Sequence, residues 1–188
     1  MPYNIINDMQ IISTPNPILT QPSQPVEKIN RQVLDLIEEM KKTLLSAQKP
    51  KGVGLAAPQI GMPLRIFITK PFPKSKIEVF INPEIVWQSK EMSEITKKKN
   101  AKLEGCLSIP GIWGLVKRHT HLKLKFTTPD GKSHRQNFSS FMANIIQHEI
   151  DHLNGRLFSS RVLEQKGKFY QISKGKEDKE VLQELSLV

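Results

Sequence analysis

The segment Phe141–Leu153 constrains the fold most, because it combines a strongly apolar helical pattern with a group of polar side chains. A serine pair that suits a helix N-cap, Ser139 and Ser140, precedes it, and Gly155, which suits a helix end, follows it. Burying histidines and carboxylates without partners costs several kcal/mol. The fold must therefore bury this helix and supply a partner for its polar groups.

Those polar groups form the pattern H-E-x-x-H from His148 to His152. Residues four apart lie on one face of a helix, about 6 Å apart along its axis. Two imidazoles at this spacing can hold one metal ion, and the glutamate between them, Glu149, can exchange a proton with a nearby water. The alternative is a pair of half-buried histidines on a charged helix. The apolar turn before the motif favours the metal site.

The one cysteine of the chain, Cys106, lies in the segment Leu103–Gly111, between glycines and a proline that favour an irregular, open turn. A single cysteine often acts only as a small buried hydrophobic residue. As a thiolate, it would instead complete a site of two histidines and one cysteine and leave a fourth position for water. The segment by itself leaves both interpretations open.

A third unusual segment, Gly52–Gly61, is rich in glycine and alanine. Such residues let a ligand approach the backbone closely, and Gln59 adds an amide donor. A tight turn packed against the preceding helix explains the same composition equally well.

The rest of the chain predicts a small α+β protein. Residues 1–24 read as an extended arm, and an amphipathic helix is expected to begin at Pro25 and to end before Pro50. The apolar stripe of that helix falls at steps of three and four. It consists of Ile29, Val33, Leu36, Ile37, Met40 and Leu44.

Strand patterns follow at 64–69 and 77–88, with Pro83 expected in a turn, and a hairpin is expected within 114–138. Residues 89–102 read as a solvated loop or hairpin tip. The tail, 167–188, fits a hairpin or a short helix. We therefore expect small antiparallel or mixed sheets packed around the central helix that carries the H-E-x-x-H motif, with one N-terminal amphipathic helix, in a single domain spanning residues 1–188.

Composition limits the partners and the compartment. The net charge of +10, from 28 Lys and Arg against 18 Asp and Glu, would attract polyanions such as RNA or the ribosome, but it is also typical of an ordinary solvated surface. No RNA-binding signature accompanies the charge, so no specific nucleic acid partner is expected. A single cysteine rules out an internal disulfide, and no apolar run reaches the ~18 residues of a membrane span. The N-terminus does not read as a signal peptide, so a cytoplasmic protein is expected.

Three blocks in this order closely resemble the signatures of the peptide deformylase family. They are G-x-G-x-A-A-x-Q at Gly52–Gln59, E-G-C-x-S at Glu104–Ser108 and Q-H-E-x-D-H at Gln147–His152. The resemblance extends from about Pro17 to about Leu163. It implies a metal-dependent hydrolase that removes the formyl group from the N-terminal methionine of new polypeptides and releases formate.

The resemblance also implies the site. Cys106, His148 and His152 would bind one divalent ion, typically Fe²⁺ in the cell, with Ni²⁺, Co²⁺ or Zn²⁺ in preparations. Glu149 would act as base and then acid. The side-chain amide of Gln59 and the backbone N–H of Leu107 would stabilise the negative charge that develops on the formyl oxygen.

N-formylmethionyl nascent peptides are the implied partners, with a transient ribosome contact through the basic surface. The methionine pocket and the extended substrate would involve Val53, Gly54, Gly105, Arg118 and Ile145. Glu104 and Asp151 would orient the ligands. Two features depart from the family pattern: Asn144 stands where an apolar or long basic residue is common, and the tail lacks the long C-terminal helix of some members.

Two other hypotheses remain. In the first, Cys106 is a nucleophile activated by a histidine, as in cysteine amidases. In the second, the chain is a basic RNA- or ribosome-binding module with a structural metal. A structural zinc site usually has four protein ligands, and the sequence shows no fourth, which argues against the second hypothesis.

Overall fold

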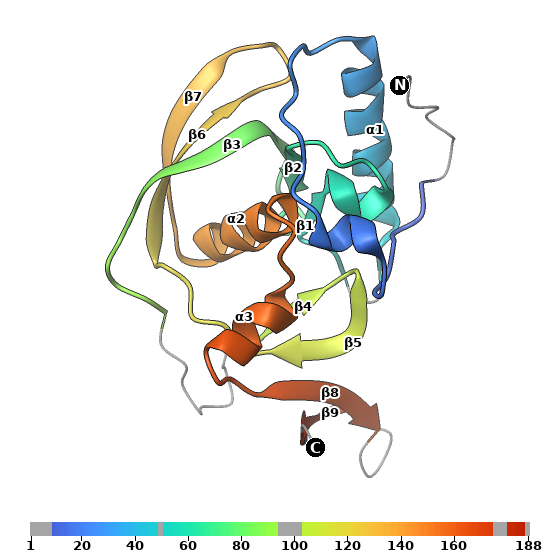
Figure 1. The fold of residues 1–188 in the computed structure, drawn as a ribbon, viewed down its shortest axis with the longest axis vertical. Coiled ribbons are helices and arrows are strands. Elements are labelled where there is room, and N and C mark those ends of the chain that lie inside the picture. The colour runs from blue at the N-terminus through green and yellow to red at the C-terminus, as the bar shows by residue number, and fades with distance from the viewer. Residues whose placement is uncertain (1–8, 49–50, 94–102, 175–179, 187–188) are drawn as a thin grey trace.

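The computed structural model describes residues 9–48, 51–93, 103–174 and 180–186. Within them it has three α-helices, two short 3₁₀ helices and nine strands (Figure 1). The helices are η1 (Pro17–Thr20), α1 (Arg31–Ser46), η2 (Ala57–Ile60), α2 (Ser140–Leu153) and α3 (Phe158–Glu164). The strands are β1 (Gly54–Ala56), β2 (Ile66–Thr69), β3 (Glu78–Gln88), β4 (Glu104–Cys106), β5 (Ile109–Gly114), β6 (His121–Thr127), β7 (Ser133–Ser139), β8 (Phe169–Lys174) and β9 (Glu180–Leu185).

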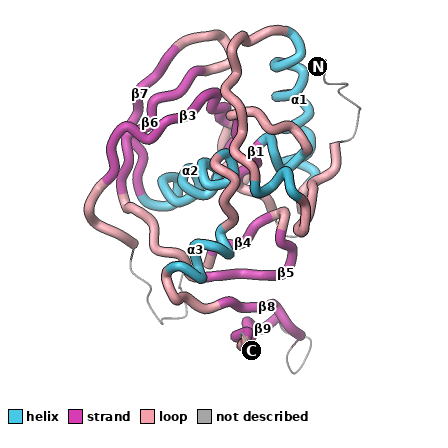
Figure 2. Tube along the Cα trace, in the orientation of Figure 1, coloured by secondary structure: helices cyan, strands magenta, loops and turns pink. Residues whose placement is uncertain are grey.

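The strands form two antiparallel sheets. One has the order β1-β2-β3-β6-β7, and the other has the order β4-β5-β8-β9. Figure 2 shows α2 inside the curve of the larger sheet, with the smaller sheet below it. The expected α+β architecture around the helix that carries the motif is therefore confirmed.

Hydrophobic packing explains why α2 is central. Apolar residues at alternate positions of β6, together with Phe138 of β7, turn their side chains toward this helix, because successive side chains of a strand point to opposite faces. One buried cluster joins the sheet and the helix, and it includes Phe67, Phe80, Leu122, Leu124, Phe126, Phe138, Ala143, Ile146, Ile150 and Leu153. Burying the apolar face of α2 leaves its other side, with His148, for the cleft between the two sheets.

The first helix begins later than predicted. α1 starts at Arg31, because Asn30 caps it: the Asn30 side-chain oxygen accepts a hydrogen bond from the N–H of Val33 at 3.0 Å. The expected start at Pro25 is therefore wrong. The predicted stripe is correct within the helix, where five of its residues are buried: Val33, Leu36, Ile37, Met40 and Leu44.

Pro83 does not make a turn but lies within β3. The pairing with β6 is irregular between Ile81 and Glu84, as at a β-bulge, where proline is tolerated. Asn82 has a φ of 49°, and its side-chain amide bonds both the N–H and the C=O of Val26 at 2.8 Å. This amide holds the segment around Val26, just before α1, against the strand.

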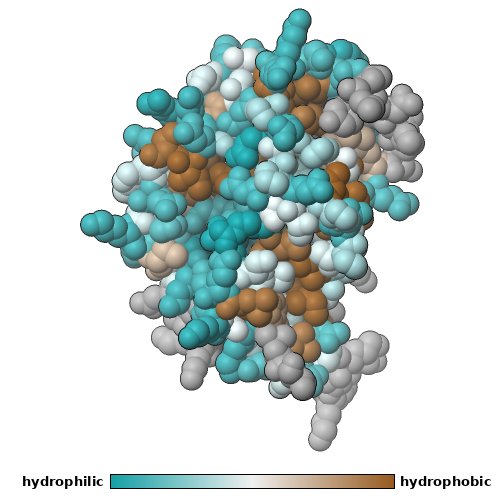
Figure 3. Space-filling view, in the orientation of Figure 1, coloured by the Kyte–Doolittle hydropathy of each residue, from teal (hydrophilic) through white to brown (hydrophobic). Residues whose placement is uncertain are grey.

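The hairpin β6–β7 and the two earlier strands, β2 and β3, are confirmed, and the tail forms the hairpin β8–β9 rather than a helix. The sequence did not predict α3 or the strands β4 and β5. The predicted loop at 89–102 lies mostly outside the described residues. No helix in the described part of the chain is long and apolar enough to cross a membrane. Figure 3 shows the hydrophobic residues of one face in separate patches among hydrophilic ones.

Candidate metal centre

The fold brings Cys106, His148 and His152 together from two elements. Cys106 ends β4, and the two histidines lie one turn apart on α2. Their candidate ligand atoms all lie within 4.8 Å of one another, and Cys106 Sγ is 3.1 Å from His152 Nε2. One thiolate and two imidazoles at this separation suit a single divalent transition-metal ion.

Electrostatics favour the thiolate. Burial acts to raise the pKa of the Cys106 thiol, but the charge on His152 and the hydrogen bonds from both histidines outweigh it and hold the pKa well below its ordinary value. A metal ion binds the thiolate form of cysteine. The arrangement of the three side chains therefore prepares Cys106 to bind a cation.

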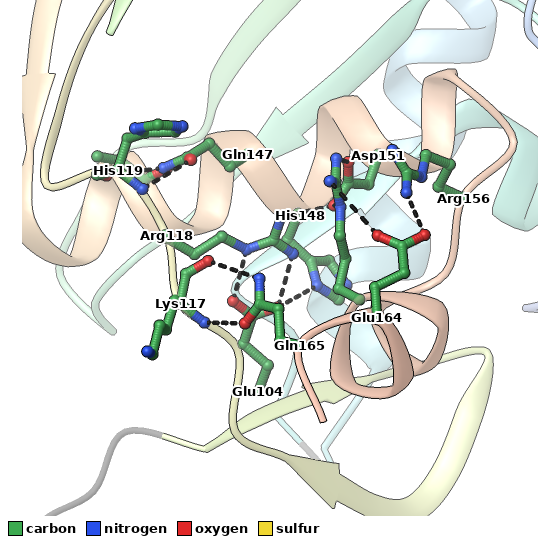
Figure 4. A network of polar contacts seen from close by, with 12 residues as sticks. Glu104, Lys117, Arg118, His119, Gln147, His148, Asp151, Arg156, Glu164 and Gln165 are labelled. Carbon is green, nitrogen blue, oxygen red and sulfur yellow. Dashed lines mark hydrogen bonds and ion pairs between the residues drawn. The ribbon is translucent and has the colours of Figure 1, made fainter. Parts of the chain in front are cut away.

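A network of buried charges orients His148 from behind (Figure 4). Glu104 Oε2 is 3.1 Å from His148 Nδ1, and the same carboxylate accepts two hydrogen bonds of 2.8 Å from Arg118. Burial acts to raise the pKa of Glu104, but its bonds with Arg118 and His148 lower it to about 2. Arg118 also donates to Asp151 at 2.5 Å, and Arg161 of α3 donates to the same carboxylate. This geometry fits the prediction that Glu104 and Asp151 orient the ligands.

The structure does not bring Arg118 to the substrate cavity. Only 3% of this residue is exposed, and its guanidinium lies between Glu104 and Asp151 behind the cluster. A guanidinium held by two carboxylates has no free face for a peptide. This position does not fit the expected contact of Arg118 with the substrate. Arg118 instead holds the carboxylates of Glu104 and Asp151 in place.

Glu149 points into the cleft beside the cluster. It is 3% exposed, it lies directly against Gly54 of β1, and one of its oxygens, Oε2, finds no hydrogen-bond partner in the described part of the chain. Burial raises the pKa of Glu149 to about 7. A carboxylate with a pKa near neutrality can accept and return a proton efficiently.

Gln59 closes the other side of the cluster. Its side-chain nitrogen lies 3.5 Å from Cys106 Sγ and donates to Ser108 Oγ at 3.2 Å, and its oxygen accepts from the N–H of Ala56. The N-terminal arm fixes both segments, because Ile12 N–H bonds Gln59 O and Thr14 N–H bonds Ser108 O. No local sequence pattern indicates this role of the arm.

A cavity of about 260 Å³ opens beside the cluster. Among the predicted site residues, it is lined by Val53, Gly54, Gln59, Gly105, Cys106, Leu107, Ile145, His148 and Glu149. Asn144, the residue that departs from the family pattern, lines it as well. Trp113 and Phe141 also line it and were not predicted. Trp113 reaches the cavity because it pairs with Gly105 between β4 and β5, two strands that the sequence did not predict.

The residues fit a metal ion. His152 Nδ1 and Glu149 Oε2 are buried without a hydrogen-bond partner among the described residues, beside a thiol whose lowered pKa favours the anion. Uncompensated polar atoms of this kind are costly. A cation among Cys106, His148 and His152 would offset the cost for the Cys106 thiolate and the Glu149 carboxylate, and His152 would bind it through Nε2, the nitrogen that faces Cys106 Sγ.

Comparison with known proteins matches residues 8–168 to the family described as polypeptide deformylase. A peptide deformylase of Bartonella tribocorum is 39% identical over 153 residues, which is 79% of this chain and 80% of that protein. One of Bartonella henselae is 40% identical over 151 residues, with coverage of 79% and 80%.

Solved structures agree. A plant peptide deformylase superposes with a TM-score of 0.77 at 29% identity, covering 87% of this chain and 85% of that chain. A peptide deformylase from Synechococcus elongatus in complex with actinonin gives 0.73 at 30% identity, covering 85% and 81%. On its sequence, its fold and its cluster of cysteine and histidines, this chain belongs to the polypeptide deformylase family.

Proposed function

We propose that this chain is a hydrolase that removes the formyl group from the N-terminal methionine of newly synthesised polypeptides and releases formate. The observation that carries the proposal is the position of Glu149, a buried carboxylate that lies beside the cluster of Cys106, His148 and His152 and lines a cavity of about 260 Å³. Family membership supports the same reaction.

Cys106, His148 and His152 would hold one divalent ion, which would supply Lewis-acid activation of water and of the formyl carbonyl. We propose Fe²⁺ as the ion in the cell, with Ni²⁺, Co²⁺ or Zn²⁺ able to replace it, because imidazole and thiolate ligands suit all four.

Glu149 is the proposed proton carrier. Its carboxylate accepts a proton from the attacking water and returns it to the nitrogen of the departing amine, first as base and then as acid. Gly54 leaves room for the carboxylate, since any larger residue there would overlap it. Gln59 and the backbone N–H of Leu107 are the proposed donors to the formyl oxygen as it gains negative charge.

The substrate backbone is proposed to lie between two sheet edges. β1 ends one sheet and β4 ends the other, and both strands contribute to the cavity wall. Val53 and Gly105 would pair with the extended peptide as in strand addition. The carbonyl of Val53 already accepts a hydrogen bond from Lys70 N–H at 2.8 Å, which leaves its second lone pair and its own N–H for the peptide. Ile145 would contact the methionine side chain.

We propose that residues 1–188 act as one deformylase domain in the cytoplasm, where formylated chains are made. The family match over residues 8–168 and the pairing of β8 with β5 support one unit. A transient contact with the ribosome would place the enzyme near its substrates, and the net charge of +10 supports such a contact.

Anaerobic purification with metal analysis, together with a formate-release assay on a formyl-Met peptide, tests this function. We expect about one ion per chain and metal-dependent formate release, lost on chelation and restored by Fe²⁺. Release that persists without metal, accompanied by stoichiometric acylation of Cys106, would instead support a cysteine nucleophile.

A further inference from the structure

The outer face of the five-stranded sheet carries cations that the metal centre does not use. Along β6 buried and exposed residues alternate, so that Lys123 and Lys125 are exposed on the side opposite the helix-facing residues Leu122 and Leu124. α2 packs on the inner side of this sheet, whereas α1 packs on the outer side over β1, β2 and the start of β3 only (Figure 1). Over β6, β7 and the end of β3 the outer face is exposed among the described residues, so a partner could reach it there.

The strand register concentrates positive charge on this face. Arg135 of β7 lies directly opposite Lys125 of β6, and both are exposed. Like charges directly opposite each other destabilise a sheet. Glu84 of β3 lies directly opposite Lys125 on its other side and offsets part of this charge. Among the described residues, however, none of the three cations Lys123, Lys125 and Arg135 forms an ion pair with a carboxylate. An anionic ligand would relieve their mutual repulsion.

A β-bulge places an aromatic ring beside these cations. The register of β3 against β6 shifts between Ile85 and Trp87, so that Ile85 pairs with Leu124 and Trp87 pairs with Lys123. Without the extra residue, Trp87 would pair with Leu122 and face the core. With it, Trp87 shares the outer face with Lys123 and is 56% exposed.

We propose that this outer face, defined by Trp87, Lys123, Lys125 and Arg135 and called here the cationic sheet face, binds single-stranded RNA without sequence preference. Exposed aromatic rings stack on bases, while neighbouring cations neutralise phosphates, and the two together are typical of single-strand binding. An acidic peptide would use the cations but would leave the large exposed indole without a matching partner. The observations therefore favour RNA.

The cationic sheet face is separate from the cavity. The cavity is lined by β1, β4 and residues of α2 such as Ile145 and His148, whereas the cationic face lies on the far side of the sheet from α2. The protein could therefore bind RNA and a peptide substrate at the same time. The idea that RNA binding holds the enzyme near the ribosome rests on the proposed function. RNA binding itself does not depend on that function.

The test uses the full chain and a fluorescein-labelled oligouridine of about 20 nucleotides, with binding followed by anisotropy at about 50 mM and about 200 mM salt. Wild-type protein should bind, with an affinity that falls as salt rises. The double variant K123E/K125E should bind at least about tenfold more weakly. K28E/K166E has the same change in charge at two exposed lysines outside the sheet and should stay within about threefold of wild type.

Trp87→Ala separates stacking from charge. It should lower affinity by at least about fivefold while leaving the salt dependence unchanged, because stacking releases no counterions. Trp87→Phe, which keeps an aromatic ring, should retain most of the wild-type affinity for RNA. Formate release and the unfolding midpoint, measured on the same preparations, should match wild type, since all the altered side chains are exposed.

Three results would overturn the proposal. They are no RNA binding by wild type at the lower salt, equal losses in K28E/K166E and K123E/K125E, and no effect of Trp87→Ala. Binding of polyglutamate but not of oligouridine would assign the face to an acidic protein instead. Because RNA binding and formate release are measured separately, loss of one does not imply failure of the other.

Discussion

The backbone of Gly54 lies directly against the carboxylate of Glu149, so closely that a β-carbon at position 54 would overlap the carboxylate oxygen. A strand edge from one sheet thus sets the position of the proposed proton carrier on the central helix.

Gly54→Ala should displace the Glu149 carboxylate. Because misplacing a catalytic group by about 1 Å can cost on the order of 100-fold in rate, we expect kcat/KM for formate release to fall by 10–100-fold with the metal content unchanged. Gly111→Ala is the control: its β-carbon would meet nothing within 4 Å, and its φ of 78° should reduce stability only. Equal rates for Gly54→Ala and wild type would contradict this account of the contact.

Glu149→Gln keeps the shape of the side chain but removes the group that accepts a proton. We expect the variant to retain its metal and to bind formyl-Met peptide, while kcat falls by at least the ~100-fold typical of a lost acid–base group. Metal content and rate must be measured on one preparation, because loss of the ion would mimic loss of the base. A near-normal rate with the metal in place would rule out Glu149 as the proton carrier.

His152→Ala should lose bound metal and activity together, because two protein ligands hold an ion poorly. Elemental analysis and formate release on the purified variant check this. His134→Ala, at an exposed histidine far along the sheet, is the control and should retain both. Near-stoichiometric metal in the His152 variant would count against the assigned ligands.

A formyl-Met peptide should react much faster than its acetylated counterpart. The methyl group of an acetyl substrate must fit where Gly54, Glu149 and Cys106 converge, and that space is already limited by the contact between the first two. Comparison of kcat/KM for the two peptides tests the pocket. Similar values would show that the reacting carbon lies elsewhere in the cavity.

Arg118→Met should weaken both the fold and the metal site. It leaves the carboxylates of Glu104 and Asp151 without their shared cation, and breaking a buried ion pair costs about 3–5 kcal/mol. Since Glu104 orients His148, metal affinity should also fall about 10–100-fold. Urea unfolding and metal titration measure the two effects.

Arg161→Gln provides the comparison for Arg118. Its side chain is 30% exposed and contacts Asp151 but not Glu104, so the loss should be smaller and should spare metal affinity. If both variants bind metal like wild type, the network around Glu104 does not support His148.

Local sequence patterns determined much of the secondary structure of this protein. Helical spacing places His148 and His152 on one face of α2, alternation predicts β6, the turn at 129–131 predicts its hairpin with β7, and the apolar stripe predicts the buried side of α1. These features depend on residues within a few positions of one another, so the chain specifies them wherever it folds.

The tertiary structure decided what depends on distant segments. Arg118 follows β5 and reads as an accessible cation in sequence, yet two carboxylates from other elements hold it behind the metal centre. A single bulge turns Trp87 outward, and the side chain of Asn82 holds the segment before α1 at Val26, which is 56 positions away in the sequence. The physical reason is that partners for buried charges, strand register and edge pairing are chosen among segments that meet only when the core forms, so no local pattern specifies them.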